Sequence, residues 1–322
     1  MMTAPLPDGL TIHNPIMADA EAVTELLNAC AIAEYGAPAY TPEDVRSTWG
    51  GSGPDQATDA WVIVSSAEQV VGYAALWRWS GLFFSEAYVH PQQRSRGIGN
   101  YLLGLIEARA IQSITEAPAG APRMLRQEIS SGNQAGHQLL ALAGYTITRH
   151  TWRMEIELTE APPTPAWPAG ITIRAFVSGQ HDRTVHAVVE EAFQQNRGHI
   201  PIPFEDWAQF MIQYEQFDPT LWFLAMDGAE IAGVALCRKR QEAMETGRVI
   251  FLAVRRPWRQ KGLGMALLRQ AFGEFYQRGI QQVSLTVDSE NITGAARLYE
   301  RAGMHIARQY NRYEKELNPG VV

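Results

Sequence analysis

Two glycine-bearing segments, each with a basic residue in front of its first glycine, are the parts of this sequence best suited to chemistry. Arg259-Gln260-Lys261-Gly262-Leu263-Gly264 follows an apolar run that ends at Val254, and Arg94-Ser95-Arg96-Gly97-Ile98-Gly99 follows a similar run that ends at Val89. A glycine turn at a helix N-terminus offers unpaired backbone N–H groups, the positive end of the helix dipole and no Cβ to obstruct close approach. Such a turn can hold a diphosphate. A single Gly-x-Gly is also what any tight strand-to-helix turn needs, so the repetition supports the interpretation.

The two segments belong to an internal repeat. Gly72 and Gly233 lie 161 positions apart, whereas Gly97 and Gly262 lie 165 apart, as loop insertions in a duplicated domain would produce. The segment 159–170 contains four prolines and suits a semi-rigid connector. For a chain of 322 residues we therefore predict a domain over 1–158, a linker over 159–170 and a second domain over 171–322.

Both halves show the same order of elements. In the second half, hydrophobic periodicity and turn signals predict strands at 171–176, 221–226, 230–240, 248–254 and 282–287, helices at 178–195, 204–216, from 263, and at 292–302, and extended segments at 304–317. Ser178 is the expected N-cap of the first of these helices. The first half repeats this order and is expected to end in a pair of strands.

Both glycine segments fit the motif of the GCN5-related N-acetyltransferase family, which is Arg or Gln, two residues, Gly, one residue, and Gly or Ala. The second half adds Asn291, Gly294-Ala295 and Leu298-Tyr299-Glu300, which resemble further signature positions of that family. The resemblance covers nearly the whole chain, and the tandem arrangement is similar to the mycothiol synthase-like acetyltransferases. It implies an α/β (α+β) fold of two tandem domains, each a mixed, mostly antiparallel sheet flanked by helices.

The resemblance also implies the reaction, which is acetyl transfer from acetyl-CoA to the amine of a small molecule by direct attack on the thioester. The strand before the motif would bind pantetheine and the acetyl carbonyl through Leu252, Ala253 and Val254. The pyrophosphate would lie on the N–H groups of Gln260, Lys261, Gly262, Leu263, Gly264 and Met265, with Arg259 and Lys261 as counter-charges. Asn291 either contacts the cofactor or caps the following helix. In the first half the matching positions are Arg94, Arg96, Gly97 and Gly99.

Tyr299 is the candidate general acid, because a phenol can protonate a departing thiolate. The first half has Leu140 at the equivalent position, so that half is expected either to bind CoA without turnover or to act as a scaffold. The general base stays open. A solvated amine could lose its proton to water, and the candidate side chains are Glu86 in the first half and Glu190, Glu191, His199, Glu242 and Glu245 in the second.

Composition sets the remaining limits. A net charge of −7 without a run of lysine or arginine disfavours nucleic acid or an anionic membrane as a partner. Cys30 and Cys237 are expected to be reduced, buried thiols, and neither they nor His181 and His186 have metal-ligand spacing. The N-terminus lacks an export signal, so we expect a cytoplasmic protein. We expect it to be a monomer or a homodimer. The alternative to an enzyme is a CoA-binding regulatory or interaction protein without turnover.

Overall fold

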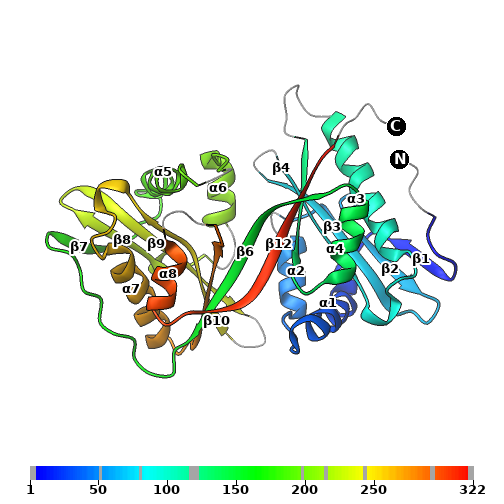
Figure 1. The fold of residues 1–322 in the computed structure, drawn as a ribbon, viewed down its shortest axis with the longest axis horizontal. Helices are drawn as coiled ribbons and strands as arrows, with labels where there is room; N and C mark the ends of the chain where they lie inside the picture. The colour runs from blue at the N-terminus through cyan, green and yellow to red at the C-terminus, as the bar shows by residue number, and fades with distance from the viewer. Residues whose placement is uncertain are drawn as a thin grey trace. The chain divides into compact units, whose positions relative to one another are not determined.

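The computed structural model describes residues 5–50, 53–79, 82–115, 123–196, 199–213, 217–241, 245–290 and 294–317. The chain forms two compact units (Figure 1). Unit 1 contains Met1–His150 together with Tyr310–Val322, and unit 2 contains Thr151–Gln309. The end of the chain therefore belongs to the same unit as its beginning. Each unit has its own hydrophobic core.

Unit 1 is a mixed sheet with the strand order β1-β2-β3-β4-β5-β12, in which β4 and β5 are parallel and the other pairs of the described strands are antiparallel. Its elements are β1 (Leu10–His13), α1 (Ala20–Tyr35), α2 (Pro42–Gly50), β2 (Ala60–Ser65), β3 (Val70–Trp79), β4 (Leu82–Val89), α3 (Ile98–Thr115), β5 (Met124–Ser130), α4 (Gln134–Leu142) and the greater part of β12 (His305–Glu316). Short 3-10 turns at Met17–Asp19 and Pro91–Gln93 precede α1 and α3.

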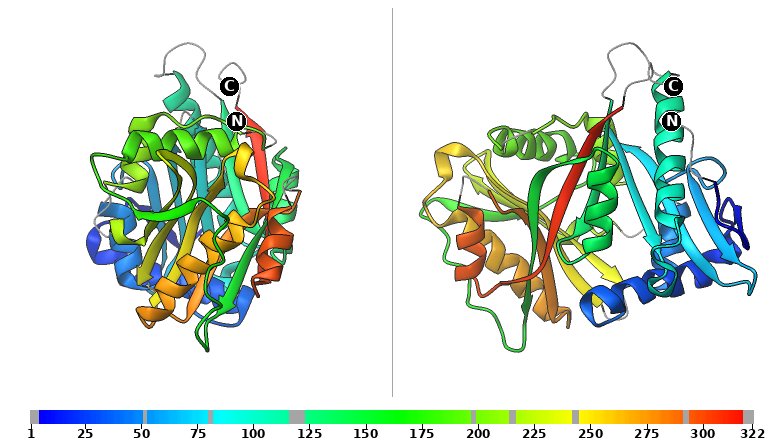
Figure 2. Two further views of the ribbon diagram at one scale, coloured as in Figure 1. Left: turned by 90° about the vertical axis from the view of Figure 1, so that its left-hand side faces the viewer. Right: turned by 45° about the vertical axis from the view of Figure 1, so that its right-hand side comes forward.

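The sheet of unit 1 has a separate core on each face. Val62 packs into the cluster formed with α1 and α2, whereas the next residue, Ile63, packs into the cluster formed with α3 and α4. Successive side chains of a strand point to opposite faces, so a sheet covered on both sides needs apolar residues at consecutive positions. Figure 2 shows helices on both faces of this sheet. Burial raises the pKa of the Cys30 thiol to about 11 on the α1 side.

Unit 2 repeats this plan with the strand order β6-β11-β10-β9-β8-β7, in which β10 and β11 are parallel and the other pairs of the described strands are antiparallel. Its elements are the greater part of β6 (Thr146–Glu157), β7 (Ile171–Ala175), α5 (Asp182–Phe193), α6 (Phe204–Met211), β8 (Trp222–Asp227), β9 (Glu230–Gln241), β10 (Glu245–Val254), α7 (Leu263–Gln277), β11 (Gln282–Asp288) and α8 (Ala295–Arg301). Short 3-10 turns at Pro219–Leu221 and Arg256–Trp258 precede β8 and α7.

Helices α7 and α8 cover one face of the sheet of unit 2, and α5 and α6 cover the other (Figure 1). On the α7 side, Gly247 lies under the ring of Phe275, where a Cβ would come within 2.8 Å of ring carbons. On the α5 side, the indoles of Trp207 and Trp222 lie 5.8 Å apart between centroids. Cys237 is a buried free thiol, and with Cys30 it confirms the prediction of two reduced cysteines.

The predicted fold class is confirmed, since each unit is a mixed, mostly antiparallel sheet flanked by helices. The predicted strand pair at the end of the first half is wrong. Residues 146–157 form one strand, because they contain no glycine, proline, asparagine or aspartate to make a turn. From Thr151 this strand pairs with β11 in unit 2, and Tyr310–Glu316 of β12 pair with β5 in unit 1.

The predicted N-cap of the first helix of unit 2 is also wrong. Helix α5 begins at Asp182 rather than after Ser178. The preceding residues form a turn in which Gly179 has a φ of 80° and its N–H donates to Asp182 Oδ1 at 2.9 Å. The carboxylate of Asp182 satisfies this turn, so the helix starts one turn later than the sequence suggested.

Candidate functional site

Strand β10 separates from its parallel neighbour before it ends. It pairs with β11 from Thr246 to Val249, whereas it pairs with β9 as far as Val254. Within the described residues, Phe251 to Val254 thus have no strand on the β11 side. Apart from the Val254 carbonyl, which accepts from Nε of Arg259, their backbone groups on that side are open to a ligand. The separation is the one that the family resemblance implies. The contacts that Leu252, Ala253 and Val254 would make with a cofactor stay a prediction.

A β-bulge at this separation changes the direction of the side chains. The register between β10 and β9 shifts between Val249 and Phe251. Gly247 faces α7, and so does Val254, whose Cγ2 would lie 3.8 Å from a Cβ on Gly264. Strict alternation would place residues seven apart on opposite faces of the sheet. The extra residue of the bulge brings Gly247 and Val254 to the same face, toward α7, and directs Phe251 toward α5. The ring of Phe193 on α5 meets Phe251 edge-on, with centroids 5.7 Å apart.

The glycine segment after β10 has a backbone conformation that suits the binding of an anion. Gln260 and Gly262 adopt left-handed φ values of 61° and 84°, and in unit 1 Ser95 and Gly97 adopt 63° and 86°. Residues in alternating right- and left-handed conformations direct successive N–H groups to one point, a backbone nest that binds anions. In the described part of the chain, the first α7 amide with a backbone acceptor is that of Ala266, bonded to Gly262. The amides of Gln260 to Met265 are therefore free for a diphosphate.

The basic residues beside this nest divide into bound and free groups. Arg259 donates through Nε to the Val254 carbonyl at 3.0 Å and through Nη2 to the Ala192 carbonyl at 2.8 Å. Lys261 is exposed and has no partner among the described residues. Arg259 thus ties the loop to β10 and α5, which leaves Lys261 as the more available counter-charge. In unit 1, Arg94 lies 3.8 Å from Glu34, and Arg96 bonds Gln93.

Tyr299 lies on α8, in the turn that packs against the beginning of α7. Its side chain is buried, and burial raises the pKa of its hydroxyl to about 12. The group is therefore protonated at neutral pH, as a general acid must be. The hydroxyl has no hydrogen-bond partner in the described ranges of the chain. Leu140 is buried at the equivalent position of unit 1 and carries no proton.

The candidate bases have very different surroundings. In unit 2, Glu190 Oε2 lies 2.9 Å from Nε2 of His199, whereas Glu191 pairs with Arg255 at 2.8 Å and Glu245 with Lys239 at 2.5 Å. Glu242 and the predicted cofactor residue Asn291 lie outside the described residues. His199 and Glu190 were predicted only as separate candidate bases. Nothing in the sequence indicates their pairing, because His199 lies beyond the end of α5 and helical spacing does not apply to it.

Glu86 is the strand carboxylate of unit 1. It lies one residue beyond Ser85, the last residue of β4 that pairs with β5. The hydroxyl of Tyr88 donates to it at 3.3 Å and lies 3.4 Å from that of Tyr40. Burial raises the pKa of Glu86 to about 7, and no cation pairs with it among the described residues. In unit 2 the equivalent residue is Phe251. It lies opposite Leu236 of β9, as Glu86 lies opposite Ala75 of β3.

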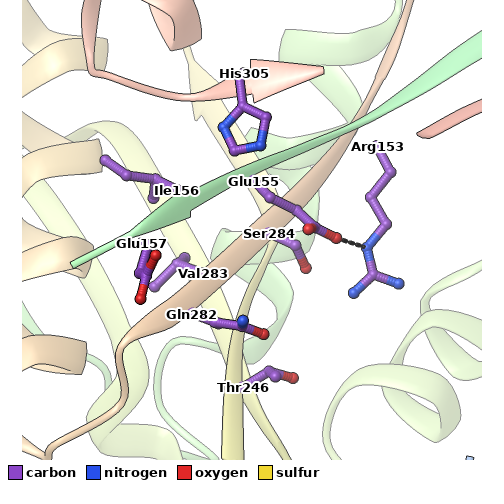
Figure 3. A pocket seen from close by; sticks show the side chains of 9 residues that line it. All are labelled: Arg153, Glu155, Ile156, Glu157, Thr246, Gln282, Val283, Ser284 and His305. Atoms are coloured by element: carbon purple, nitrogen blue, oxygen red, sulfur yellow. Dashed lines mark ion pairs between the residues drawn. The ribbon is translucent and has the colours of Figure 1, made fainter. Parts of the chain in front are cut away.

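A cavity of about 220 Å³ in unit 2 lies apart from these groups. Figure 3 shows Arg153 and Glu155 directed toward one another in it, with Nε and Oε1 2.8 Å apart, and Thr246 at its far side. Thr246 is near the beginning of β10, whereas the nest follows the end of that strand. No predicted site residue lines the cavity, so we place the candidate site at the nest and the strand separation.

Comparison with known proteins tests the family. The model of the Acetyltransferase (GNAT) family matches residues 20–145 and 185–304, which contain both glycine segments. The chain belongs to this family. The sequence resemblance is thereby confirmed, including the two tandem GNAT regions, and the chain is an N-acetyltransferase of the kind that uses acetyl-CoA as donor.

Several individual proteins are similar to this GNAT chain. A mycothiol acetyltransferase of Streptomyces scabiei is 31% identical over 75% of each chain, and one of Thermobispora bispora is 29% identical over 88% of this chain and 92% of its own. A GCN5-related N-acetyltransferase from Sphaerobacter thermophilus has a solved structure that is 36% identical, with a TM-score of 0.87 over 98% of both chains. A tandem GNAT protein from the clavulanic acid biosynthesis pathway, 16% identical with a TM-score of 0.72, shares the fold over 97% of this chain and 99% of its own.

Neither a membrane-spanning helix nor a cluster of metal ligands is found in the described residues of the GNAT chain. No helix there is long and apolar enough to cross a membrane. No group of three or more His, Cys, Asp or Glu side chains there could hold a metal ion.

Proposed function

We propose that unit 2 transfers the acetyl group of acetyl-CoA to the amine of a small molecule by direct attack on the thioester. The observation that carries this proposal is the coincidence, in one unit, of a backbone nest, a separated and bulged strand and a protonated phenol. Unit 1 has the nest and the separation, but its β4 pairs with β3 without a register shift and its α4 presents Leu140.

The backbone of unit 2 supplies the binding of the donor. The free amides of Gln260 to Met265 and the N-terminus of α7 would hold the pyrophosphate of CoA, with Lys261 as a counter-charge. The backbone of Leu252, Ala253 and Val254, apart from the Val254 carbonyl that Arg259 already binds, would hold pantetheine and the acetyl carbonyl. An N–H directed at the carbonyl oxygen stabilises the negative charge that develops there, by about 3 kcal/mol in acyl transfer. No side chain is needed for that role.

Tyr299 would complete the reaction as the acid. When the amine nitrogen bonds to the acetyl carbon, the C–S bond breaks and the sulfur needs a proton. The hydroxyl of Tyr299 is protonated and without a partner in the described residues, so it can give that proton without first breaking another hydrogen bond.

The relatives suggest the class of acceptor. Proteins named mycothiol acetyltransferase match most of this chain, so the acceptor that we propose is the cysteinyl amine of a small thiol, such as an aminosugar that carries cysteine. We infer in addition that the protein acts on this acceptor as a monomer or homodimer, and that unit 1 binds CoA through Arg94, Arg96, Gly97 and Gly99 without turnover. The sequence division at 159–170 stays our proposal for the evolutionary boundary of the two GNAT regions.

The test is a panel of amines assayed for release of CoA from acetyl-CoA. The panel contains a cysteine-bearing aminosugar, cysteamine, glucosamine and lysine, and each is tested with wild type and with Tyr299→Phe. We expect acetylation of the cysteinyl amine by wild type, and a fall of kcat by about 10²-fold in Tyr299→Phe with CoA binding unchanged. Tyr276→Phe, an exposed tyrosine on α7, is the matched control.

Three outcomes are informative. Equal kcat in wild type and Tyr299→Phe would show that the assigned acid is wrong. Turnover of glucosamine but not of the cysteinyl amine would remove the acceptor class and leave the reaction. CoA binding without acetylation of any amine would support the alternative, a binding protein without turnover.

A further inference from the structure

The last turn of α5 is fixed against the part of β10 that has separated from β11. Phe193 packs edge-on against Phe251, and the Ala192 carbonyl accepts from Arg259 at 2.8 Å. Glu191 of α5 accepts at 2.8 Å from Arg255, which directly follows β10. The side chains of this turn therefore border the segment in which the donor's acetyl group would lie.

Glu190 shares one side of this turn with Phe193. The two residues are three apart on α5, and residues at that spacing lie on the same helix face. Glu190 Oε2 lies 2.9 Å from Nε2 of His199, which belongs to the segment between α5 and α6. Both side chains are half-buried, at 18% and 16% exposure for Glu190 and His199. The pair is thus shielded but accessible to a small molecule.

The pairing fixes the tautomer of the histidine. An ionised carboxylate only accepts hydrogen bonds, so Nε2 of His199 carries the hydrogen and donates it to Glu190. In the neutral ring, Nδ1 then carries the lone pair. A neutral imidazole held by a carboxylate at one nitrogen is arranged to accept a proton at the other.

The neighbouring histidines of unit 2 are used differently. Nε2 of His186 contacts the Ile202 carbonyl at 2.8 Å, and its ring packs against Trp207. Nδ1 of His181 accepts from the N–H of Val177 at 3.0 Å in the turn before α5. Of these three histidines, His199 is the one that contacts a carboxylate. Its other ring nitrogen can accept a proton.

We propose that His199, oriented by Glu190, accepts the proton of the attacking amine in unit 2, an inference that rests on the proposed function. The neutral amine nitrogen bonds to the acetyl carbon, and its proton passes to Nδ1 of His199. The C–S bond breaks, and the sulfur takes the proton of Tyr299. The proton on His199 then returns to the Tyr299 oxygen through solvent, which restores both groups and leaves an amide and free CoA.

Unit 1 supports the assignment by contrast. At the repeat offset of 161, the positions of Glu190 and His199 are Ala29 and Pro38. The pair of glutamate and histidine is therefore absent from unit 1. Unit 1 instead has a carboxylate on β4, Glu86, at the position where β10 of unit 2 has Phe251. The pair accordingly occurs in the unit that carries Tyr299.

The experiment compares His199→Ala, Glu190→Gln and Glu190→Asp with wild type, on the member of the amine panel that wild type acetylates. We expect His199→Ala to lower kcat by about 10²-fold or more with the KM for acetyl-CoA unchanged, and added imidazole to restore part of the rate. Glu190 acts through His199 as a positioning residue. Glu190→Gln should therefore lower kcat by about tenfold, and Glu190→Asp should recover most of it. His305→Ala, an exposed histidine of the same unit, is the control.

The outcomes separate the two proposals. Unchanged kcat in His199→Ala, or a loss that imidazole does not restore, overturns the proton-accepting role and leaves the proposed function standing. A wild type that acetylates no member of the panel overturns the proposed function, and the role of His199 with it.

Discussion

Gly264 on the first turn of α7 lies against Leu298 of α8 so closely that a Cβ at position 264 would be 3.3 Å from Leu298 Cδ2. Unit 1 repeats the contact, with 3.1 Å between the corresponding Cβ on Gly99 and Leu139 Cδ2. Leu298 precedes Tyr299, so this contact sets the position of the candidate acid relative to the nest. The second glycine of the motif is therefore a packing residue, whereas the first, Gly262, is needed for its left-handed φ.

Substitution of Gly264 should distinguish packing from backbone conformation. Gly264→Ala brings a close contact with a flexible side-chain end but improves helix propensity, so its free energy of unfolding should stay within about 1 kcal/mol of wild type. Gly264→Val must displace Leu298 and should lose about 1 to 3 kcal/mol together with a lower kcat. Urea unfolding and initial rates measure the two effects.

Gly273→Val is the matched control for this prediction. Gly273 lies on the same helix, and nothing stands within 4 Å of a Cβ built there. A Gly264→Val enzyme as active and as stable as Gly273→Val would contradict the link between Leu298 and Tyr299.

Arg259 and Lys261 should differ in what they contribute. Arg259→Lys loses the planar fork that bridges the carbonyls of Val254 and Ala192, so it should lower the free energy of unfolding by about 1 to 3 kcal/mol. Lys261→Met removes an exposed charge without a partner in the described residues, so its stability should be that of wild type and its Kd for CoA higher. Calorimetric titration with CoA at low and high salt measures this.

The salt dependence supplies the decisive comparison. Loss of a phosphate counter-charge should make CoA affinity less sensitive to salt in Lys261→Met than in wild type. If Arg259→Lys instead shows the flatter salt dependence at unchanged stability, the assignments of the two residues are reversed.

The sequence predicted the elements well and their partners less well. Strand 82–89 and the helix start at Leu263 appear as expected, because strong apolar periodicity and glycine punctuation are local signals. The partner of a strand is not a local property, so nothing in residues 146–157 or 305–316 indicated that β6 completes unit 2 and β12 completes unit 1. The bulge in β10 was not predicted for the same reason, because a bulge is defined by the register of β10 with β9.

The candidate site shows the same limit at the level of side chains. A motif arginine was expected to face the cofactor, yet Arg259 is bound to two carbonyls that lie 5 and 67 positions away in the sequence. The repeat also hides compensating changes. Unit 2 has Gly247 on the strand and Phe275 on the helix, whereas the matching positions of unit 1 are Phe83 and Ala110, both buried. The large residue is on the helix in unit 2 and on the strand in unit 1. The exchange keeps the packed volume between strand and helix and lowers the sequence similarity between the halves.

Glu86 should make the stability of the protein depend on pH. Burial raises the pKa of this carboxyl from 4.5 to about 7, so between these values the folded state holds a proton that the unfolded state has lost. The free energy of unfolding therefore decreases as pH rises through this window.

Glu86→Gln keeps an acceptor for Tyr88 and removes the titration. It should stabilise the protein on the order of 2 kcal/mol at pH 8 and have little effect at pH 5. Denaturant unfolding at pH 5, 6 and 8 measures the difference, with the exposed Glu25→Gln as control. A gain that is equal at pH 5 and pH 8 would show that Glu86 is ionised in the folded protein across the whole range, and that Tyr88 and Tyr40 enclose a charge rather than a neutral acid.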